Sequence, residues 1–102
     1  MGTFHTACTL ENHADRSRRV VMRKLLVDTG NEYTWVPTAK LEKIGVTREK
    51  KDLPFVMANG AVVTRSAGFA VLRVGQSFTI DEVVFAEPGD LALLGARSRV
   101  ST

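Results

Sequence analysis

An acidic residue at the end of an apolar run is the first candidate for chemistry in this 102-residue sequence. The segment LLV leads directly into Asp28, Thr29 and Gly30, and aromatic, strand-forming residues follow. A buried strand that ends in this way places a carboxylate on a tight turn at the edge of a core, where burial and neighbouring groups control its protonation. Because an uncompensated charge is costly in such a place, the pattern indicates a functional carboxylate.

Alternating hydrophobicity predicts the element that delivers Asp28 to this turn. Residues 3–11 alternate as a half-buried strand does, and residues 19–27 are expected to form a second strand. The polar segment NHADRS between them is typical of a turn. We therefore expect a β-hairpin whose second strand runs into Asp28.

The segment after the acidic turn is predicted to contain a short strand, a helix and a charged loop. Residues 33–36 are strand-forming. The segment from Pro37 to Gly45 has apolar residues one helical turn apart, and glycine is a typical helix end. The charged run REKKD, residues 48–52, is expected to be a loop.

The second half of the chain is predicted to consist of strands. Asn59 and Gly60 separate two apolar segments, and this dipeptide is a strong hairpin signal because both turn residues must tolerate positive φ. Strands are expected at residues 69–74 and 78–85, and a turn then leads into the apolar run LALLG, which ends at Gly95. About seven short strands and one helix predict an all-β fold, a small closed or partly closed β-barrel.

Composition limits the partners that can be expected. A chain of this length is expected to form a single domain over residues 1–102. The formal net charge is +3, but the basic residues are not interleaved with aromatic residues that could stack on bases, so nucleic acid is not an expected partner. No run of about 18 apolar residues is present to span a membrane, so a membrane is not expected either.

The cysteine content and the N-terminus bear on location and on metal binding. Cys8 is the only cysteine, which excludes an intrachain disulfide and fits a reducing compartment. The first ten residues lack the basic start and long apolar stretch of a signal peptide, so a cytoplasmic location is expected. The other possible metal ligands in this region are His5, His13 and Asp15. Because their spacing is not that of a compact zinc site, no metal and no cofactor are expected.

The order of these motifs resembles that of the retropepsin-like aspartic proteases, the half-sized relatives of pepsin. The resemblance covers nearly the whole chain, and the segments LLVDTGNEYTWVP and VVFAEPGDLALLGAR look most like the bacterial members. It implies a retropepsin-type barrel in which Asp28 is catalytic. It also implies that Thr29 braces the two active-site loops and that Gly30 lets the backbone turn tightly beside the partner carboxylate.

The same resemblance implies which residues bind substrate. The projecting hairpin of the family is a flap over the substrate, and it corresponds to residues 57–62. The substrate-binding residues predicted in this way are Met57, Ala58, Asn59, Gly60 and Ala61 of the flap, with Asn31 beside the aspartate. The late apolar run, residues 93–95, is implied to pass under the active-site loop and support it.

The chemistry accounts for these residue types. Hydrolysis of a peptide bond without a metal needs a base to activate water and an acid to protonate the amide, and two adjacent carboxyl groups supply both. One chain offers one such aspartate, so a two-fold homodimer is expected to bring Asp28 and its symmetry mate together. Two carboxylates about 3 Å apart repel by roughly 5 kcal/mol at an effective dielectric constant of about 20, so they must share a proton. The expected function is an aspartic endopeptidase acting on a peptide or protein substrate.

Two features differ from the family pattern. Asn31 stands where the family usually has Ser, Ala or Thr, and its side-chain amide could still donate to the carboxylate of Asp28. Family chains also continue past the apolar run into a helix and usually a last strand, whereas this chain stops at Thr102. Either the coding sequence is truncated or dimerisation relies on other surfaces. We expect the 102-residue form to be a monomer or a weak dimer with little activity, and an extended chain to be competent.

Three alternative interpretations stay open. Asp28 can be an ordinary turn residue whose carboxylate caps backbone amides. The chain can also be a catalytically silent dimerisation or peptide-binding module of the same fold. The net charge alone would fit a small basic β-barrel that binds nucleic acid. Trp35, just after the acidic turn, is expected in the core or in a pocket wall.

Overall fold

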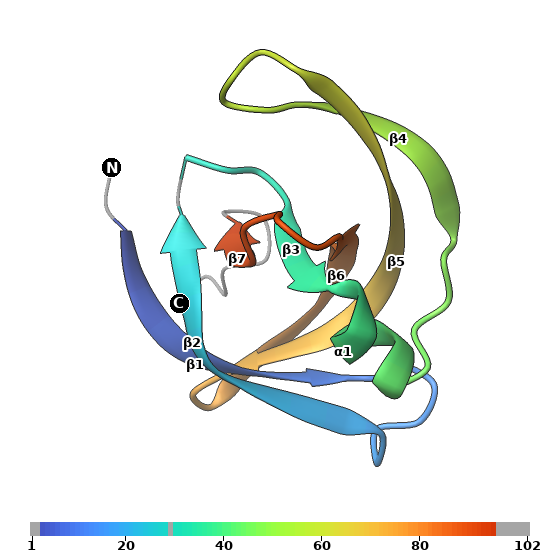
Figure 1. Cartoon of the computed structure of the whole chain (residues 1–102). Coiled ribbons are helices and arrows are strands. Elements are labelled where there is room, and N and C mark those ends of the chain that lie inside the picture. Colours follow the sequence, from blue (N-terminus) through green and yellow to red (C-terminus); the bar gives the residue numbers. More distant parts are fainter. Residues whose placement is uncertain (1–2, 29, 96–102) are drawn as a thin grey trace.

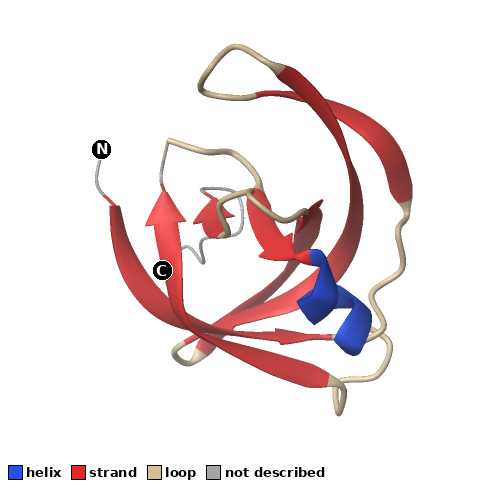
Figure 2. Ribbon diagram, in the orientation of Figure 1, coloured by secondary structure: helices blue, strands red, loops and turns tan. Residues whose placement is uncertain are grey.

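Seven strands and one short helix form the part of the chain that the computed structural model describes, residues 3–28 and 30–95 (Figure 1). In chain order these elements are β1 (Thr3–Glu11), β2 (Arg19–Asp28), β3 (Thr34–Pro37), α1 (Thr38–Lys43), β4 (Lys50–Val56), β5 (Val62–Val74), β6 (Ser77–Ala86) and β7 (Leu93–Gly95). The predicted all-β class with one short helix is confirmed, as Figure 2 shows.

The strands close into a six-membered ring. Neighbouring strands follow the order β1, β2, β7, β3, β6 and β5, and a further pairing between β1 and β5 joins the two ends. Two of these pairings, β2 with β7 and β3 with β6, are parallel. The prediction of a small β-barrel is confirmed, and the barrel is closed. In an open sheet the two edge strands would each lack a partner on one side, whereas closure pairs β1 with β5.

The hairpin of β1 and β2 is the predicted N-terminal hairpin, and Asp28 is its last residue. The antiparallel register places Glu11 opposite Arg19 beside the turn, and Asp28 lies at the far end of the ladder. Alternate residues of β2 point inward, so Leu25 and Val27 are buried. Core packing therefore holds this strand up to the residue before Asp28.

A second hairpin projects from the ring (Figure 1). β5 pairs with β6 from Ala67 onward, whereas residues 62–65 pair with β4 alone. The sequence predicts a hairpin arm just after Gly60 and a separate strand at residues 69–74, but β5 is continuous over 13 residues, because pairing passes directly from β4 at Arg65 to β6 at Ala67. We call residues 50–66 the projecting hairpin.

The first strand of the projecting hairpin begins earlier than the sequence predicts. Residues 48–52 are not all loop, because β4 starts at Lys50. The pairing register shifts between Lys50 and Leu53, where Asp52 adopts a positive φ of 58°. A β-bulge of this kind admits an extra residue into a strand without ending it. The charged composition of residues 48–52 predicted a loop, because a local sequence pattern does not show that these residues pair with β5.

The turn of the projecting hairpin also differs from the predicted form. Positive φ occurs at Gly60 (87°) but not at Asn59. The Gly60 N–H donates to the Met57 carbonyl at 2.8 Å, and the Met57 N–H donates to the Ala61 carbonyl at 2.8 Å. This pattern fits a type I turn followed by a glycine bulge, so only one of the two predicted residues needs the unusual conformation.

Helix α1 lies between β3 and the projecting hairpin in the chain and covers part of the core. Leu41 and Ile44 are buried, and Gly45 follows with a φ of 75°, a conformation typical of the residue that ends a helix. The predicted helix is therefore confirmed. No helix in the described ranges is long and apolar enough to cross a membrane.

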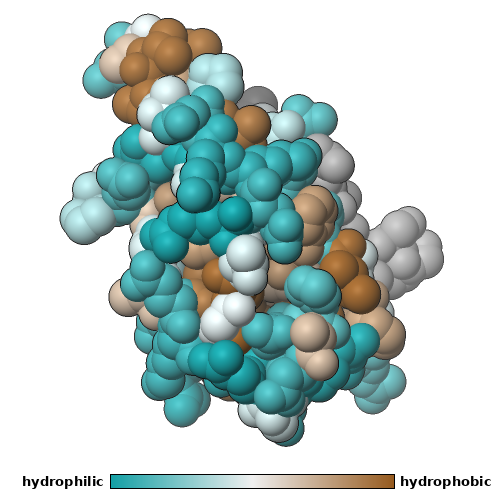
Figure 3. All heavy atoms as spheres, turned by 90° about the vertical axis from the view of Figure 1, so that its right-hand side faces the viewer, coloured by the Kyte–Doolittle hydropathy of each residue, from teal (hydrophilic) through white to brown (hydrophobic). Residues whose placement is uncertain are grey.

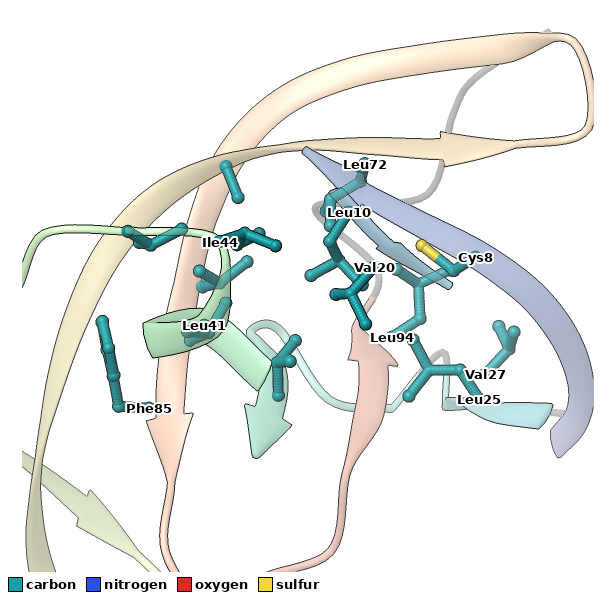
Figure 4. Packing of buried hydrophobic residues seen from close by; sticks show 14 residues of the cluster. Cys8, Leu10, Val20, Leu25, Val27, Leu41, Ile44, Leu72, Phe85 and Leu94 are labelled. Carbon is teal, nitrogen blue, oxygen red and sulfur yellow. The ribbon is translucent and has the colours of Figure 1, made fainter. Parts of the chain in front are cut away.

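Two hydrophobic clusters stabilise the structure. The larger fills the ring, and Figure 4 shows Leu10, Leu25 and Leu94 among its buried members. The smaller lies on the side of the projecting hairpin and consists of Trp35, Val84, Ala86 and Leu93, with Leu26, Tyr33, Phe55 and Met57 packed against it. Phe55 and Met57 of the projecting hairpin thus pack against this second, smaller cluster and not against the main core.

Candidate active site

Asp28 ends β2 between two neighbouring strands. Its position in the ladder pairs with Thr3 of β1 on one side and with Gly95 of β7 on the other. Its side chain is half-buried and borders a cavity under the projecting hairpin. The two flanking strands therefore fix the main chain of Asp28 while its carboxylate reaches the cavity.

One backbone amide orients the Asp28 carboxylate, and a second stabilises the turn that follows it. The Gly30 N–H donates to Asp28 Oδ1 at 3.0 Å, and the Asn31 N–H donates to the Asp28 carbonyl at 3.1 Å. A Cβ atom at residue 30 would lie 3.3 Å from Oδ1, so glycine suits this close approach. Among the described residues, no Lys or Arg nitrogen lies within 4.0 Å of the carboxylate. Thr29 falls outside the described residues, and its bracing role stays a prediction.

Asn31 stabilises the turn through its side chain. Its Oδ1 accepts a hydrogen bond from the Tyr33 N–H at 3.1 Å, and the residue also lines the cavity. The sequence allowed its amide to donate to the Asp28 carboxylate, but no such bond forms among the described residues. An asparagine that bonds to the backbone two residues later is typical of turns. The departure from the family pattern therefore has a local structural role.

Strand β7 runs directly under the turn that follows Asp28. The Gly95 N–H donates to the buried Thr34 Oγ1 at 3.0 Å. A Cβ atom at residue 95 would lie 2.3 Å from the Tyr33 carbonyl oxygen and 2.9 Å from that of Asn31. Only glycine permits so close a passage of two backbones. Leu94 pairs beside Val27 of β2, so the apolar run lies where the resemblance implied a support.

The cavity beside Asp28 has a volume of about 300 Å³. It is lined by Asp28, Asn31, Trp35, Phe55, Val56, Met57, Ala58, Leu91 and Leu93. Of the predicted substrate-binding residues, Met57, Ala58 and Asn31 therefore lie together with Asp28. Asn59, Gly60 and Ala61 do not line it, because they form the exposed turn of the hairpin.

Several lining residues were not predicted as site residues. Phe55 packs edge-on against Trp35 with ring centroids 4.9 Å apart, and Leu91 and Leu93 also line the cavity. Phe55 could have been found from the sequence, because residues two apart on a strand share a face and Met57 was already predicted. No local signal points to Leu91. Trp35 lies in the pocket wall, one of the two places expected for it.

The possible metal ligands of the N-terminal region do not meet in space. His5, His13 and Asp15 are exposed, whereas Cys8 is buried in the main core. Burial raises the pKa of the Cys8 thiol to about 11, so this side chain is protonated at neutral pH. No three His, Cys, Asp or Glu side chains in the described ranges are grouped in a way that could hold a metal ion.

A comparison with protein families agrees with the arrangement of β2, the projecting hairpin and β7. A family model described as aspartyl protease matches residues 17–97. The chain belongs to the aspartyl protease family. The matched range includes Asp28, the projecting hairpin and the Gly95 run. A comparison with curated proteins finds no match. The closeness to bacterial members stays a prediction.

Proposed function

We propose that this chain is an aspartic endopeptidase and that Asp28 supplies one half of its catalytic pair. The observation that carries the proposal is the position of the Asp28 carboxylate, which a backbone amide holds beside a mostly apolar cavity that the projecting hairpin also lines. Membership of the aspartyl protease family supports the reaction class. The reaction is hydrolysis of a peptide bond.

The second carboxyl group comes from a second copy of the chain. Two copies of Asp28 related by a two-fold axis can sit close enough to hold one proton between them, since two adjacent negative charges repel strongly. The ionised carboxylate takes a proton from water, whose oxygen attacks the carbonyl carbon of the peptide bond. The protonated carboxyl group donates its proton to the nitrogen as the carbon–nitrogen bond breaks, giving a carboxylic acid and an amine.

The cavity indicates the kind of side chain that lies next to the cleaved bond. Its walls are mostly apolar and include Trp35, Phe55 and Leu93. Transfer of an apolar side chain into such a cavity is favourable by roughly 25 cal/mol per Å² buried. We therefore propose that the substrate is an extended peptide with a large apolar side chain beside the cleaved bond.

Exposed apolar residues at the tip of the projecting hairpin support the proposal that a substrate or a second copy of the chain covers the site. Val56 and Val62 face each other across the hairpin and are 75% and 65% exposed. Figure 3 shows hydrophobic residues gathered at this end of the molecule, at the top of the view. Covering these valines with a substrate or a second copy of the chain would remove apolar surface from water, which lowers the free energy of the complex.

The test is a subunit-mixing experiment with Asp28→Asn. The substitution keeps side-chain volume but removes the base and the acid, so cleavage of a peptide library should fall by about 10³-fold or more. Adding an excess of Asp28→Asn chain to the parent should suppress parental activity as mixed dimers form. Val21→Thr, an exposed position on the same strand, is the control and should suppress nothing.

The pH profile and binding separate the alternatives. A pair that acts with one proton predicts a bell-shaped rate profile with an acidic to mildly acidic optimum. Cleavage that survives Asp28→Asn would show that Asp28 is not the catalyst. Peptide binding without cleavage by the parent would favour the silent peptide-binding module instead. Sedimentation across a concentration series tests whether the chain forms the expected weak dimer. The cytoplasmic location stays a prediction.

A further inference from the structure

The projecting hairpin contacts the rest of the chain in two chemically different ways. Phe55 packs against the rings of Trp35 and Tyr33, with centroids 4.9 Å and 5.5 Å away. Arg65 of β5 forms an ion pair with Asp90, which lies in the connection between β6 and β7.

Apolar contacts tolerate sliding because the hydrophobic effect is non-directional, whereas charged hydrogen bonds fix direction. Lys50, at the base of the hairpin, also forms an ion pair with Glu82 of β6 at 3.2 Å, but its side chain is half exposed and neither residue lines the cavity. The ion pair between Arg65 and Asp90 is therefore the charged contact that can set the position of the hairpin beside the cavity.

The ion pair between Arg65 and Asp90 is bidentate and largely buried. Arg65 Nε donates to Asp90 Oδ2 at 2.7 Å, and Arg65 Nη2 donates to Asp90 Oδ1 at 2.9 Å. The side chains of Arg65 and Asp90 are only 14% and 7% exposed. Two parallel hydrogen bonds from a planar guanidinium fix orientation as well as distance.

Asp90 is in turn held by its own loop, next to the cavity. Its Oδ2 accepts a hydrogen bond from the Glu87 N–H at 2.8 Å, and its N–H donates to the Glu87 carbonyl at 2.9 Å. The following residue, Leu91, lines the cavity together with Phe55 of the projecting hairpin. The ion pair thus connects the projecting hairpin to the β6–β7 connection, and both of these segments contribute walls of the cavity.

We propose that Arg65 and Asp90 are positioning residues that set the separation between the projecting hairpin and the Leu91 wall, and thereby the size of the side chain that the cavity accepts. This inference rests on the proposed peptidase function for its consequence in catalysis. Its structural part, the separation of the two walls, can be measured without any activity.

The ion pair suits a site that works in acid. The hydrogen bond from Arg65 holds the pKa of Asp90 below its usual range. Asp90 therefore remains ionised, and the pair remains formed, as the solution becomes mildly acidic. Glu87, Arg65 and the backbone of the turn are the groups that face this carboxylate in the described structure.

The experiment compares Arg65→Met with Arg48→Met. Arg48 also forms one ion pair, with Glu42 at 3.2 Å, but it does not line the cavity, so it is the matched control. The first readout is fluorescence of Trp35, the only tryptophan, which is 6% exposed beside Phe55. Arg65→Met should shift its emission to longer wavelength and increase its quenching by acrylamide, and Arg65→Lys should partly restore both values.

The second readout is selectivity between two peptides that have leucine or alanine beside the cleaved bond. In Arg65→Met the ratio of their kcat/KM values should fall by about tenfold, mainly through KM for the leucine peptide, because a misplaced wall no longer fits the larger side chain. Partial unfolding would lower both kcat/KM values equally and leave the ratio unchanged.

The outcomes separate this inference from the proposed function. Equal quenching and equal selectivity in Arg65→Met and Arg48→Met would overturn the positioning role. If the parent cleaves neither peptide, the proposed function fails, and quenching of Trp35 alone then decides whether the ion pair sets the wall. Increased quenching of Trp35 in Arg65→Met, with no increase in Arg48→Met, would support the positioning role whether or not the parent cleaves the peptides.

Discussion

Two carboxylates mark the two ends of the β1–β2 hairpin, and their surroundings differ. Glu11 ends β1 and is nearly fully buried, with Arg73 Nε at 2.7 Å, Arg16 Nη1 at 3.5 Å and Arg19 Nη1 at 3.9 Å from its oxygens. Asp28 ends β2, is half-buried and is bonded by a backbone amide. The carboxylate at the strand closure is surrounded by cations, whereas the one proposed for catalysis has no Lys or Arg nitrogen within 4.0 Å among the described residues.

The arginines around Glu11 stabilise the place where β1 and β5 close the ring. Arg73 belongs to β5, and its position pairs with Thr9 where β1 and β5 close the ring. Arg73 and Arg16 also lie over the ring of Phe78, at 4.9 Å and 5.4 Å from its centroid. The ionic and aromatic contacts together join the first strand to the late strands at the point of closure.

The largest expected effect comes from breaking the support under Asp28. Gly95→Ala would place a Cβ atom 2.3 Å from the Tyr33 carbonyl oxygen, so a backbone must move. We expect a loss of about 3 kcal/mol or more in the free energy of unfolding, measured by urea denaturation. Gly60→Ala is the control, because no atom lies within 4 Å there and only its φ of 87° opposes alanine, at a cost of about 1 kcal/mol. Equal losses in the two variants would contradict the tight passage of β7.

The next effect compares the two carboxylates directly. Glu11→Gln removes a buried negative charge from three cations, two of which are more than two-fifths exposed and can be hydrated, so we expect a loss of about 2 kcal/mol. Asp28→Asn should change the free energy of unfolding by less than about 0.5 kcal/mol. Thermal and urea denaturation of both variants tests the contrast. A more stable Glu11→Gln would show that the arginines do not need this carboxylate.

An effect smaller than that of Glu11→Gln is expected at Asp90, which has one cation partner and so stands between the other two carboxylates. Because Arg65 holds the pKa of Asp90 below its usual range, the ion pair contributes stability above the unfolded-state pKa, near 3.9, and loses it as pH falls through the lower folded-state value. Asp90→Asn should therefore be about 1 kcal/mol less stable than the parent above about pH 5, and this difference should shrink towards pH 3. Urea denaturation at several pH values measures it. A difference independent of pH would mean that the charge is irrelevant.

Features that depend on neighbouring residues could be predicted from the sequence. Asp28 ends a strand because apolar residues precede it, Gly45 ends α1, and Gly60 turns the projecting hairpin. Each is determined by residues a few positions away. The bulge at Asp52 could not be predicted, because it depends on how β4 meets β5.

Features that depend on distant pairs could not be predicted from local pattern. Thr9 meets Arg73 to close the ring, and Arg65 meets Asp90 across 25 positions. The cavity beside Asp28 is lined both by the projecting hairpin and by Leu91 of the β6–β7 connection, which lie far apart in the sequence. The resemblance to a family identified the aspartate and part of the hairpin, but it gave no information on what fixes the distance between the walls.

Strand β4 lies at the end of the strand order in the described sheet, with β5 as its partner, and its outer edge is poorly suited to accept another strand. Pro54 has no N–H to donate, Lys50 and Lys51 are exposed on this strand, and the bulge at Asp52 interrupts the ladder. These are recognised protections of an edge strand against aggregation. These features let the chain expose a long hairpin without polymerising through it, which matters for the proposed function because that function pairs two half-sites at high local concentration.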